Sequence, residues 1–112
     1  MNLISWKEFE KVEIRVGTIV EVSDFPDAIK PAYKVKIDLG SKLGIKKSSA
    51  QITDLYSKNE LLNKQVMVVV NFHPKQIGPF ISECLITGFY KDKKSVVLAV
   101  PDKFVPNGTI LS

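Results

Sequence analysis

The chain has 112 residues, of which 45% are hydrophobic and 25% charged, a composition that predicts one folded domain over residues 1–112 and excludes an intrinsically disordered chain. Its one cysteine, Cys84, cannot form an internal disulfide, so a reducing compartment suits the chain. The longest aliphatic run covers residues 66–70, far short of the ~20 residues that a membrane span needs. We therefore expect a cytoplasmic protein that does not insert into a membrane.

The net charge is +4 at pH 7, and the sixteen basic residues are all lysines except Arg15. A positive balance favours polyanionic partners, although charge alone leaves open whether the chain binds any. Lysine acts as a point charge, whereas arginine offers a planar fork that matches base edges. The abundance of lysine therefore favours phosphate contact and shape recognition over base-specific readout.

The N-terminal residues predict a short helix followed by a long strand. Ser5 and Glu8 have the spacing of a capping box, which should open a helix that ends at about Phe9. Apolar residues then alternate with charged ones over residues 12–22, as in a half-buried strand. Gly17 lies within this strand, where a glycine usually marks a bulge or a bend. Such a bend lets one long strand serve both halves of a small barrel.

Two further strands and a helix follow. Residues 33–39 alternate between apolar and charged side chains, which predicts a second strand. After a turn at residues 40–44, residues 45–51 predict a third strand, whose serines and lysines suit an edge or a ligand-facing position. A second serine-to-glutamate capping spacing predicts a short helix within residues 54–63.

The second half of the chain predicts the remaining strands. Residues 65–72 form a nearly continuous β-branched run, the pattern of a strand buried on both faces. Residues 80–90 and 95–100 predict two strands joined by a charged turn, residues 91–94, at one end of a barrel. This order predicts an all-β protein with an OB-fold, a five-stranded antiparallel barrel with a short N-terminal helix and a helix between strands three and four. An SH3-like barrel is the main alternative, but it normally lacks room for that second helix.

The residue inventory argues against catalysis. His73 is the only histidine and Cys84 the only cysteine, so neither a multi-histidine nor a cysteine-rich metal site can be assembled. His73 adjoins Pro74 with no nucleophile motif around it, and the sequence contains no glycine-rich phosphate loop. We therefore expect a binding protein without catalytic residues, metal or cofactor.

Five lysines are candidates for contact with RNA. Lys34 and Lys36 lie on the opposite side of their strand from Val35, and two more lysines follow on the predicted third strand. The second and third strands of an OB-fold form the usual oligonucleotide platform. The alternative, that these lysines only solvate the polar face of a sheet, fits the pattern equally well. The candidate phosphate contacts are Lys34, Lys36, Lys46, Lys47 and Lys75.

Several short motifs lie in order along nearly the whole chain: Arg15-Val16-Gly17-Thr18-Ile19, Pro26-Asp27-Ala28, Ile37-Asp38-Leu39-Gly40, Asn71-Phe72-His73-Pro74-Lys75 and Ser82-Glu83-Cys84-Leu85. They resemble the tRNA-binding domain family, whose members occur as free-standing dimers and as appended domains of some aminoacyl-tRNA synthetases. Within that family, residues 44–53 are similar to the free-standing CsaA type, described as an export-related chaperone. Cys84 and Leu85 replace a common glycine and methionine, and Pro79 replaces a usual glycine, so we expect a differently shaped loop over residues 76–80.

The resemblance implies tRNA or a similar structured RNA as the partner, with Asn71 and Ser82 adding polar contacts to those of the lysines. It also implies an alternative, a chaperone that holds unfolded or pre-secretory polypeptide in apolar pockets. Phe72 and Phe80 are the candidate lining of such pockets, on different strands from the lysines. A scaffold for the assembly of synthetases is a third reading, by family analogy alone.

The resemblance further implies a homodimer built through the N-terminal helix and the C-terminal strand. Apolar residues at the two ends of the chain exceed what one small barrel needs, which fits this implication. The alternative is that these residues only plug the ends of the barrel. The residues concerned are Leu3, Ile4, Trp6, Phe9, Phe104, Ile110 and Leu111.

Overall fold

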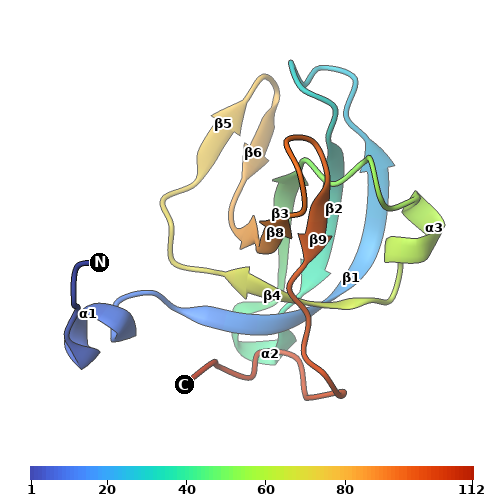
Figure 1. Ribbon diagram of the computed structural model, residues 1–112. Coiled ribbons are helices and arrows are strands. Elements are labelled where there is room, and N and C mark those ends of the chain that lie inside the picture. The colour runs from blue at the N-terminus through green and yellow to red at the C-terminus, as the bar shows by residue number, and fades with distance from the viewer.

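The computed structural model describes residues 1–112 and contains a strongly curved antiparallel sheet (Figure 1). Its central strand β1 (Ile14–Asp24) pairs with β2 (Tyr33–Asp38) along one edge and with β4 (Gln65–Val69) along the other. The outer strands are β3 (Ile45–Ala50), beside β2, and β7 (Leu85–Ile86), beside β4. The order of the five strands is therefore β3-β2-β1-β4-β7.

The two outer strands meet and nearly close the sheet into a barrel. The backbone N–H of Glu83 donates to the carbonyl of Lys47 over 2.8 Å, and the hydroxyl of Ser48 donates to the carbonyl of Cys84 over 2.9 Å. Curvature brings β3 and β7 together although they are the first and last strands in the sheet order. The predicted OB-fold barrel of five antiparallel strands is confirmed.

Apolar side chains from all five strands fill the barrel. Ile19, Ile37 and Val66 are 0% exposed, and Leu61 from helix α3 (Lys58–Leu61) joins them, also at 0%. The hydroxyl of Ser57 caps α3, as the sequence predicts, and the helix lies between the third and fourth strands of the barrel. It is shorter than the range of residues 54–63 in which it was expected.

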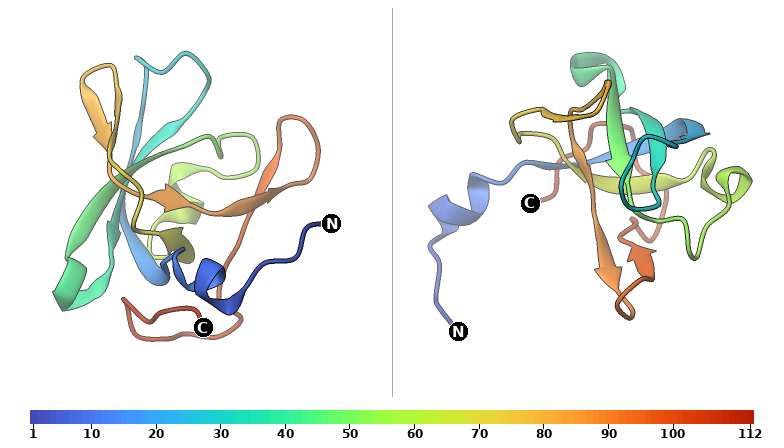
Figure 2. Two further views of the ribbon diagram at one scale, coloured as in Figure 1. Left: turned by 90° about the vertical axis from the view of Figure 1, so that its left-hand side faces the viewer. Right: turned by 90° about the horizontal axis from the view of Figure 1, so that it is seen from above.

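Helix α1 (Trp6–Glu10) begins at the predicted Ser5–Glu8 capping box and projects from the barrel without a buried residue (Figure 2). Its connection to β1 is held by Asn71. The side-chain amide of Asn71 donates to the carbonyl of Lys11 over 2.7 Å, and its oxygen accepts from the N–H of Glu13 over 3.0 Å. The helix therefore stands at a defined place although it makes little contact with the core. No helix of the structure has both the length and the hydropathy to cross a membrane.

The inward face of β1 differs from the predicted one. The strand begins at Ile14 rather than residue 12, and its register with β2 shifts between Ile19 and Glu21. This bulge buries Ile19 completely and leaves Val20 39% exposed, so the alternation expected over residues 12–22 does not persist along the whole strand. The bulge was predicted at Gly17 but lies about three residues further along the strand.

The region after β4 also departs from expectation. A hairpin of β5 (Lys75–Ile77) and β6 (Phe80–Ser82) occupies what was expected to be a loop. The single strand expected over residues 80–90 is divided into β6, β7 and β8 (Gly88–Tyr90), because the chain turns to bond with β3 and then with β9 (Val96–Leu98). The expected turn at residues 40–44 is the short helix α2 (Gly40–Leu43). Strand β4 is buried on both faces only at its end, where Val68 and Val69 are both buried, whereas Met67 is half-buried.

Gly17 has a packing role that generates a prediction. A Cβ atom at this position would lie 2.5 Å from Cγ2 of Ile37 and 2.8 Å from Cδ2 of Leu39, both of which are core side chains. Gly17→Ala should lower the free energy of unfolding by about 1–3 kcal/mol, because the core has no space for the methyl group. Val20→Ala, on the exposed bulge of the same strand, should change it by less than about 0.5 kcal/mol. Urea denaturation of both variants tests this, and equal stabilities would contradict it.

Candidate nucleic-acid interface

Three lysines share the outer surface of strands β2 and β3, and we call Lys34, Lys36 and Lys47 the lysine face. Val35 and Ile37 point into the core with 1% and 0% exposure, so the alternating residues of β2 point outward. Lys47 of β3 lies directly opposite Lys36 in the register of the two strands. The three side chains therefore project from one side of one strand pair.

The lysine face contains uncompensated positive charge. Like charges directly opposite each other destabilise an antiparallel pair by a few tenths to about 1 kcal/mol, and Lys36 and Lys47 form such a pair. Glu21 of β1 approaches Lys36 to 3.4 Å, but both side chains are about half exposed, so this ion pair stabilises the protein little. Glu21 is thus the only carboxylate that forms an ion pair with any of the three ammonium groups.

Aromatic rings border this surface on the side of the β5–β6 hairpin. The rings of Phe25 and Phe80 lie 5.3 Å apart, and they join the loop before β2 to the hairpin. The ammonium of Lys34 lies 5.8 Å from the centre of the Phe25 ring, and that of Lys47 lies 5.5 Å from the Phe80 ring. A hollow of about 130 Å³ between these groups is lined by Glu21, Ser23, Lys34, Val35, Lys36, Lys47 and Phe80.

Two of the five predicted lysines lie elsewhere. Lys46 is opposite the buried Ile37, so it starts on the core side of β3 rather than on the lysine face. The prediction that Lys46 lies on the same platform as Lys47 is wrong, because adjacent residues of a strand point to opposite faces. Lys75 is exposed on β5 of the hairpin, opposite Ser82, at the border of the lysine face.

The two polar residues of the family motif are engaged within the chain. Asn71 uses both ends of its amide to hold the segment before β1, as described above. The hydroxyl oxygen of Ser82 accepts from the N–H of Ser49 over 3.1 Å, and Glu83 accepts from the N–H of Lys47 over 3.0 Å. Ser82 and Glu83 thereby satisfy the outer edge of β3. Asn71 and Ser82 thus contribute to the framework of the site, and their contact with RNA stays a prediction.

The two phenylalanines proposed for peptide binding are in different surroundings. Phe72 is 59% exposed in the connection after β4. Phe80 is half-buried against Phe25 and lies beneath Lys47. Phe80 lies on β6, so it is on a different strand from the lysines, as expected, but its contact with Lys47 places it at the border of the lysine face.

The apolar residues at the chain ends remain mostly uncovered. Trp6 is 63% exposed and packs against Phe9, with 5.3 Å between the ring centres. At the other end, an isolated bridge joins Ile110 to Arg15 of β1, whose guanidinium donates to the carbonyl of Gly108 over 2.7 Å. The remaining exposed apolar side chains are Leu3 at 89%, Ile4 at 65%, Phe104 at 81%, Ile110 at 50% and Leu111 at 45%.

The two residues considered for nucleophilic chemistry are in different surroundings. His73 is exposed after β4, whereas Cys84 is buried at the seam between β3 and β7. Burial raises the pKa of the Cys84 thiol to about 12, with a smaller contribution from the Glu83 carboxylate. The structure contains no group of three histidine, cysteine, aspartate or glutamate side chains placed to hold a metal ion.

The nearly closed five-stranded barrel with its short helices defines an OB-like fold, and it carries the lysine face on one strand pair. The family described as putative tRNA binding domain matches residues 14–110, and the chain belongs to this family.

Relatives and solved structures extend this result. Methionine–tRNA ligase of Pyrococcus furiosus is 39% identical over 96% of the chain, and that of Leptospira biflexa is 41% identical over 98%. The chain spans 14% and 16% of the lengths of these two ligases. The crystal structure of chaperone CsaA from Bacillus anthracis superimposes with a TM-score of 0.93 at 39% identity, over 99% of this chain and 100% of that one. The CsaA chaperone of Picrophilus torridus gives 0.91 at 51% identity, over 98% and 100%.

The buried position of Cys84 generates a prediction about its reactivity. With a pKa of about 12, roughly one thiol in ten thousand is ionised at pH 8, and the thiolate is the reactive form. Labelling with a disulfide reagent at pH 8 should therefore be far slower in the native protein than in guanidinium chloride. The native rate should rise with pH towards 12, because the thiolate fraction grows. Rapid labelling of the native protein at pH 8 would show that the seam between β3 and β7 opens readily.

Proposed function

We propose that this protein binds tRNA or a similarly structured RNA as a non-catalytic module, recognising phosphates and shape. The observation that carries the proposal is the pair of lysines, Lys36 and Lys47, set directly opposite each other on the strand pair. A like-charge pair disfavours the unbound protein, and phosphate groups between the two ammoniums relieve the repulsion.

The chemistry of the lysine face fits phosphate better than base edges. Its hollow of about 130 Å³ is shallow, and the three lysines offer point charges rather than planar donors. Phosphate contacts position an RNA without reading its sequence. Lys75 on the hairpin extends the same charge beyond Phe80, so that a backbone could follow the border between sheet and hairpin.

The choice of tRNA among structured RNAs is supported by the family. Methionine–tRNA ligases carry a region similar to this chain, although it makes up 14–16% of their length. We infer that residues 1–112 form one such domain in the cytoplasm, where tRNA is available and the free thiol of Cys84 stays reduced.

We further propose a homodimer through the two chain ends. Helix α1 stands away from the barrel with Trp6 63% exposed, and Leu3 before the helix is 89% exposed. Exposed apolar side chains that lie together in this way mark an interaction surface. An apolar pocket of about 190 Å³ lies beside the C-terminal segment, lined in part by Met67, Val105 and Leu111. A second copy that covers these surfaces would place two lysine faces on one particle, an arrangement suited to a bulky folded RNA.

A chaperone function is the second candidate. Two CsaA chaperones share the fold at 39% and 51% identity, and Phe72 exposes 59% of its surface beside the hairpin. An exposed aromatic ring of this kind could hold an apolar segment of an unfolded polypeptide. Phe72 is the residue that separates this function from RNA binding, because Phe80 is part of the lysine face.

Removing charge from the lysine face tests RNA binding. Lys36→Ala and Lys47→Ala should each weaken tRNA binding and reduce the slope of log K against log salt by roughly one, because each lysine displaces counterions from phosphate. Lys42→Ala is the matched control, since Lys42 is exposed on α2 at the other end of the barrel (Figure 1). Filter binding at several salt concentrations gives both quantities.

Equal losses for Lys42→Ala and Lys36→Ala would mean diffuse attraction and would overturn the site. The same titrations with a reduced, unfolded protein as competitor address the chaperone function, which burial of apolar surface should make insensitive to salt. If Phe72→Ala abolishes peptide holding while tRNA binds no better than heparin, the chaperone function takes first place.

Truncating Trp6 tests the homodimer. Trp6→Ala should raise the dissociation constant of the dimer about thirtyfold or more, since an interface tryptophan commonly contributes ~2 kcal/mol or more. Leu62→Ala is the control, because Leu62 is an exposed apolar residue, at 44%, just after α3. Sedimentation velocity over a concentration series measures the change. A monomeric wild-type protein at micromolar concentration, or an unchanged Trp6→Ala dimer, would refute the arrangement.

A further inference from the structure

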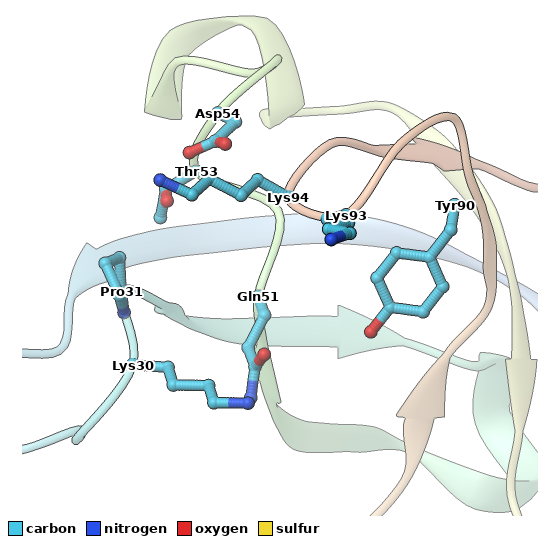
Figure 3. A pocket seen from close by; sticks show the side chains of 8 residues that line it. All are labelled: Lys30, Pro31, Gln51, Thr53, Asp54, Tyr90, Lys93 and Lys94. Atoms are coloured by element: carbon cyan, nitrogen blue, oxygen red, sulfur yellow. The ribbon is translucent and has the colours of Figure 1, made fainter.

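A second cationic site lies at the end of the barrel, apart from the lysine face. Lys30 of the β1–β2 loop and Lys93 and Lys94 of the β8–β9 turn line a cavity of about 390 Å³ (Figure 3). The floor between them comes from the connection that leaves β3, and it includes Gln51 and Thr53. Lys93 and Lys94 belong to the charged turn that the sequence predicts at one end of the barrel.

The three ammonium groups of this cavity carry no internal counter-ion. The ion pairs of the protein involve Arg15, Lys36 and Lys58 only, so Lys30, Lys93 and Lys94 are in none of them. Asp54 is the one carboxylate in the lining. Three positive charges thus face one negative charge in a concave site, a setting that concentrates anions.

The turn that presents two of these lysines is preformed. The carboxylate of Asp92 accepts from the N–H of Lys94 over 3.0 Å and from that of Ser95 over 2.9 Å. These backbone hydrogen bonds hold the pKa of Asp92 below its ordinary value. The carboxylate is therefore ionised at neutral pH and continues to accept both N–H groups. An anion would therefore meet lysines whose backbone is already ordered.

The cationic cavity continues into an apolar one. A neighbouring cavity of about 400 Å³ shares Gln51 and Tyr90 with the first and is otherwise walled in part by Leu85, Ile86 and Val96. Tyr90 is 74% exposed, and the hydroxyl end of its ring points towards the cationic cavity (Figure 3). The combined cleft offers ammonium groups at one end, an exposed aromatic ring in the middle and aliphatic walls at the other end.

We infer that this cleft binds a nucleotide. Its phosphate would lie among Lys30, Lys93 and Lys94, and its base would stack on Tyr90 with the aliphatic wall beyond. The side chains of Gln51, Thr53 and Asp54 offer donors and acceptors for the ribose and the base edge. The phosphate of a nucleotide matches the ammonium groups, and its base matches the aromatic ring and the aliphatic wall. Such a ligand occurs as a free nucleotide and as an unpaired nucleotide of an RNA.

The inference goes beyond RNA binding by the lysine face, because the cleft shares no residue with Lys34, Lys36 and Lys47. It predicts affinity for a mononucleotide even if tRNA does not bind the sheet. If the cleft fails the test while the lysine face passes, the proposed function stands.

Amide NMR spectra of the full chain test the cleft. Titration with adenosine 5′-monophosphate should shift the amides of Gln51, Thr53, Tyr90 and Lys94, whereas inorganic phosphate or adenosine alone should do so at least about tenfold more weakly. Tyr90→Ala should weaken the binding of the nucleotide about tenfold, and so should the double variant Lys93→Ala with Lys94→Ala. Lys42→Ala should leave it unchanged, and well-dispersed spectra confirm that each variant is folded.

A short single-stranded oligonucleotide identifies the source of the ligand. Binding much tighter than that of the mononucleotide indicates an unpaired nucleotide of RNA, and comparable binding indicates a free nucleotide; both support the site. Absence of shifts in these amides with either ligand would overturn it. Shifts that persist unchanged in the Tyr90 and lysine variants would overturn it as well.

Discussion

The bonds between β3 and the Ser82–Cys84 segment are the interaction on which the rest of the structure depends. Ser82, the last residue of β6, and Glu83 accept the N–H groups of Ser49 and Lys47, and the N–H of Glu83 donates to the carbonyl of Lys47. Without them the outer edge of β3 would be open, as edge strands are in an unclosed sheet. The same bonds bury Cys84, set the hairpin against the sheet and bring Phe80 beneath Lys47.

This closure explains why a serine and an asparagine of the family motif look functional in sequence although they act as framework. Ser82 and Asn71 flank the hairpin, and each satisfies backbone groups that secondary structure leaves unpaired. The Ser82 bond is partly buried, so leaving the N–H of Ser49 unpaired would cost up to ~1–3 kcal/mol, whereas the Asn71 bonds are exposed and contribute less. Residues of this kind hold the neighbouring strands, and with them the lysines, in place.

Local signals in the sequence predicted local structure well and tertiary pairing poorly. The capping boxes at Ser5 and Ser57 and the alternation of β2 depend on neighbouring residues, so helix starts and the outward Lys34 and Lys36 followed directly. The bulge after Ile19 is set by the register against β2 rather than by Gly17 itself. The pairing of Phe25 with Phe80, and the cleft of Lys30 with Lys93, join distant segments, and no periodicity in one segment can report such contacts.

Acidic and basic side chains divide the work of folding and binding. Several carboxylates accept backbone N–H groups and so build caps, turns and the barrel seam: Glu8, Asp38, Glu60, Glu83 and Asp92. Among the lysine ammoniums, by contrast, only those of Lys36 and Lys58 reach a carboxylate. A carboxylate that accepts backbone N–H groups is held in place, whereas the ammonium group of an unpaired lysine can turn towards an approaching polyanion. The attraction between them extends over a Debye length of about 8 Å at physiological salt. The net charge of +4 therefore understates how cationic the mobile surface is to a nucleic acid, on the lysine face and at the barrel end alike.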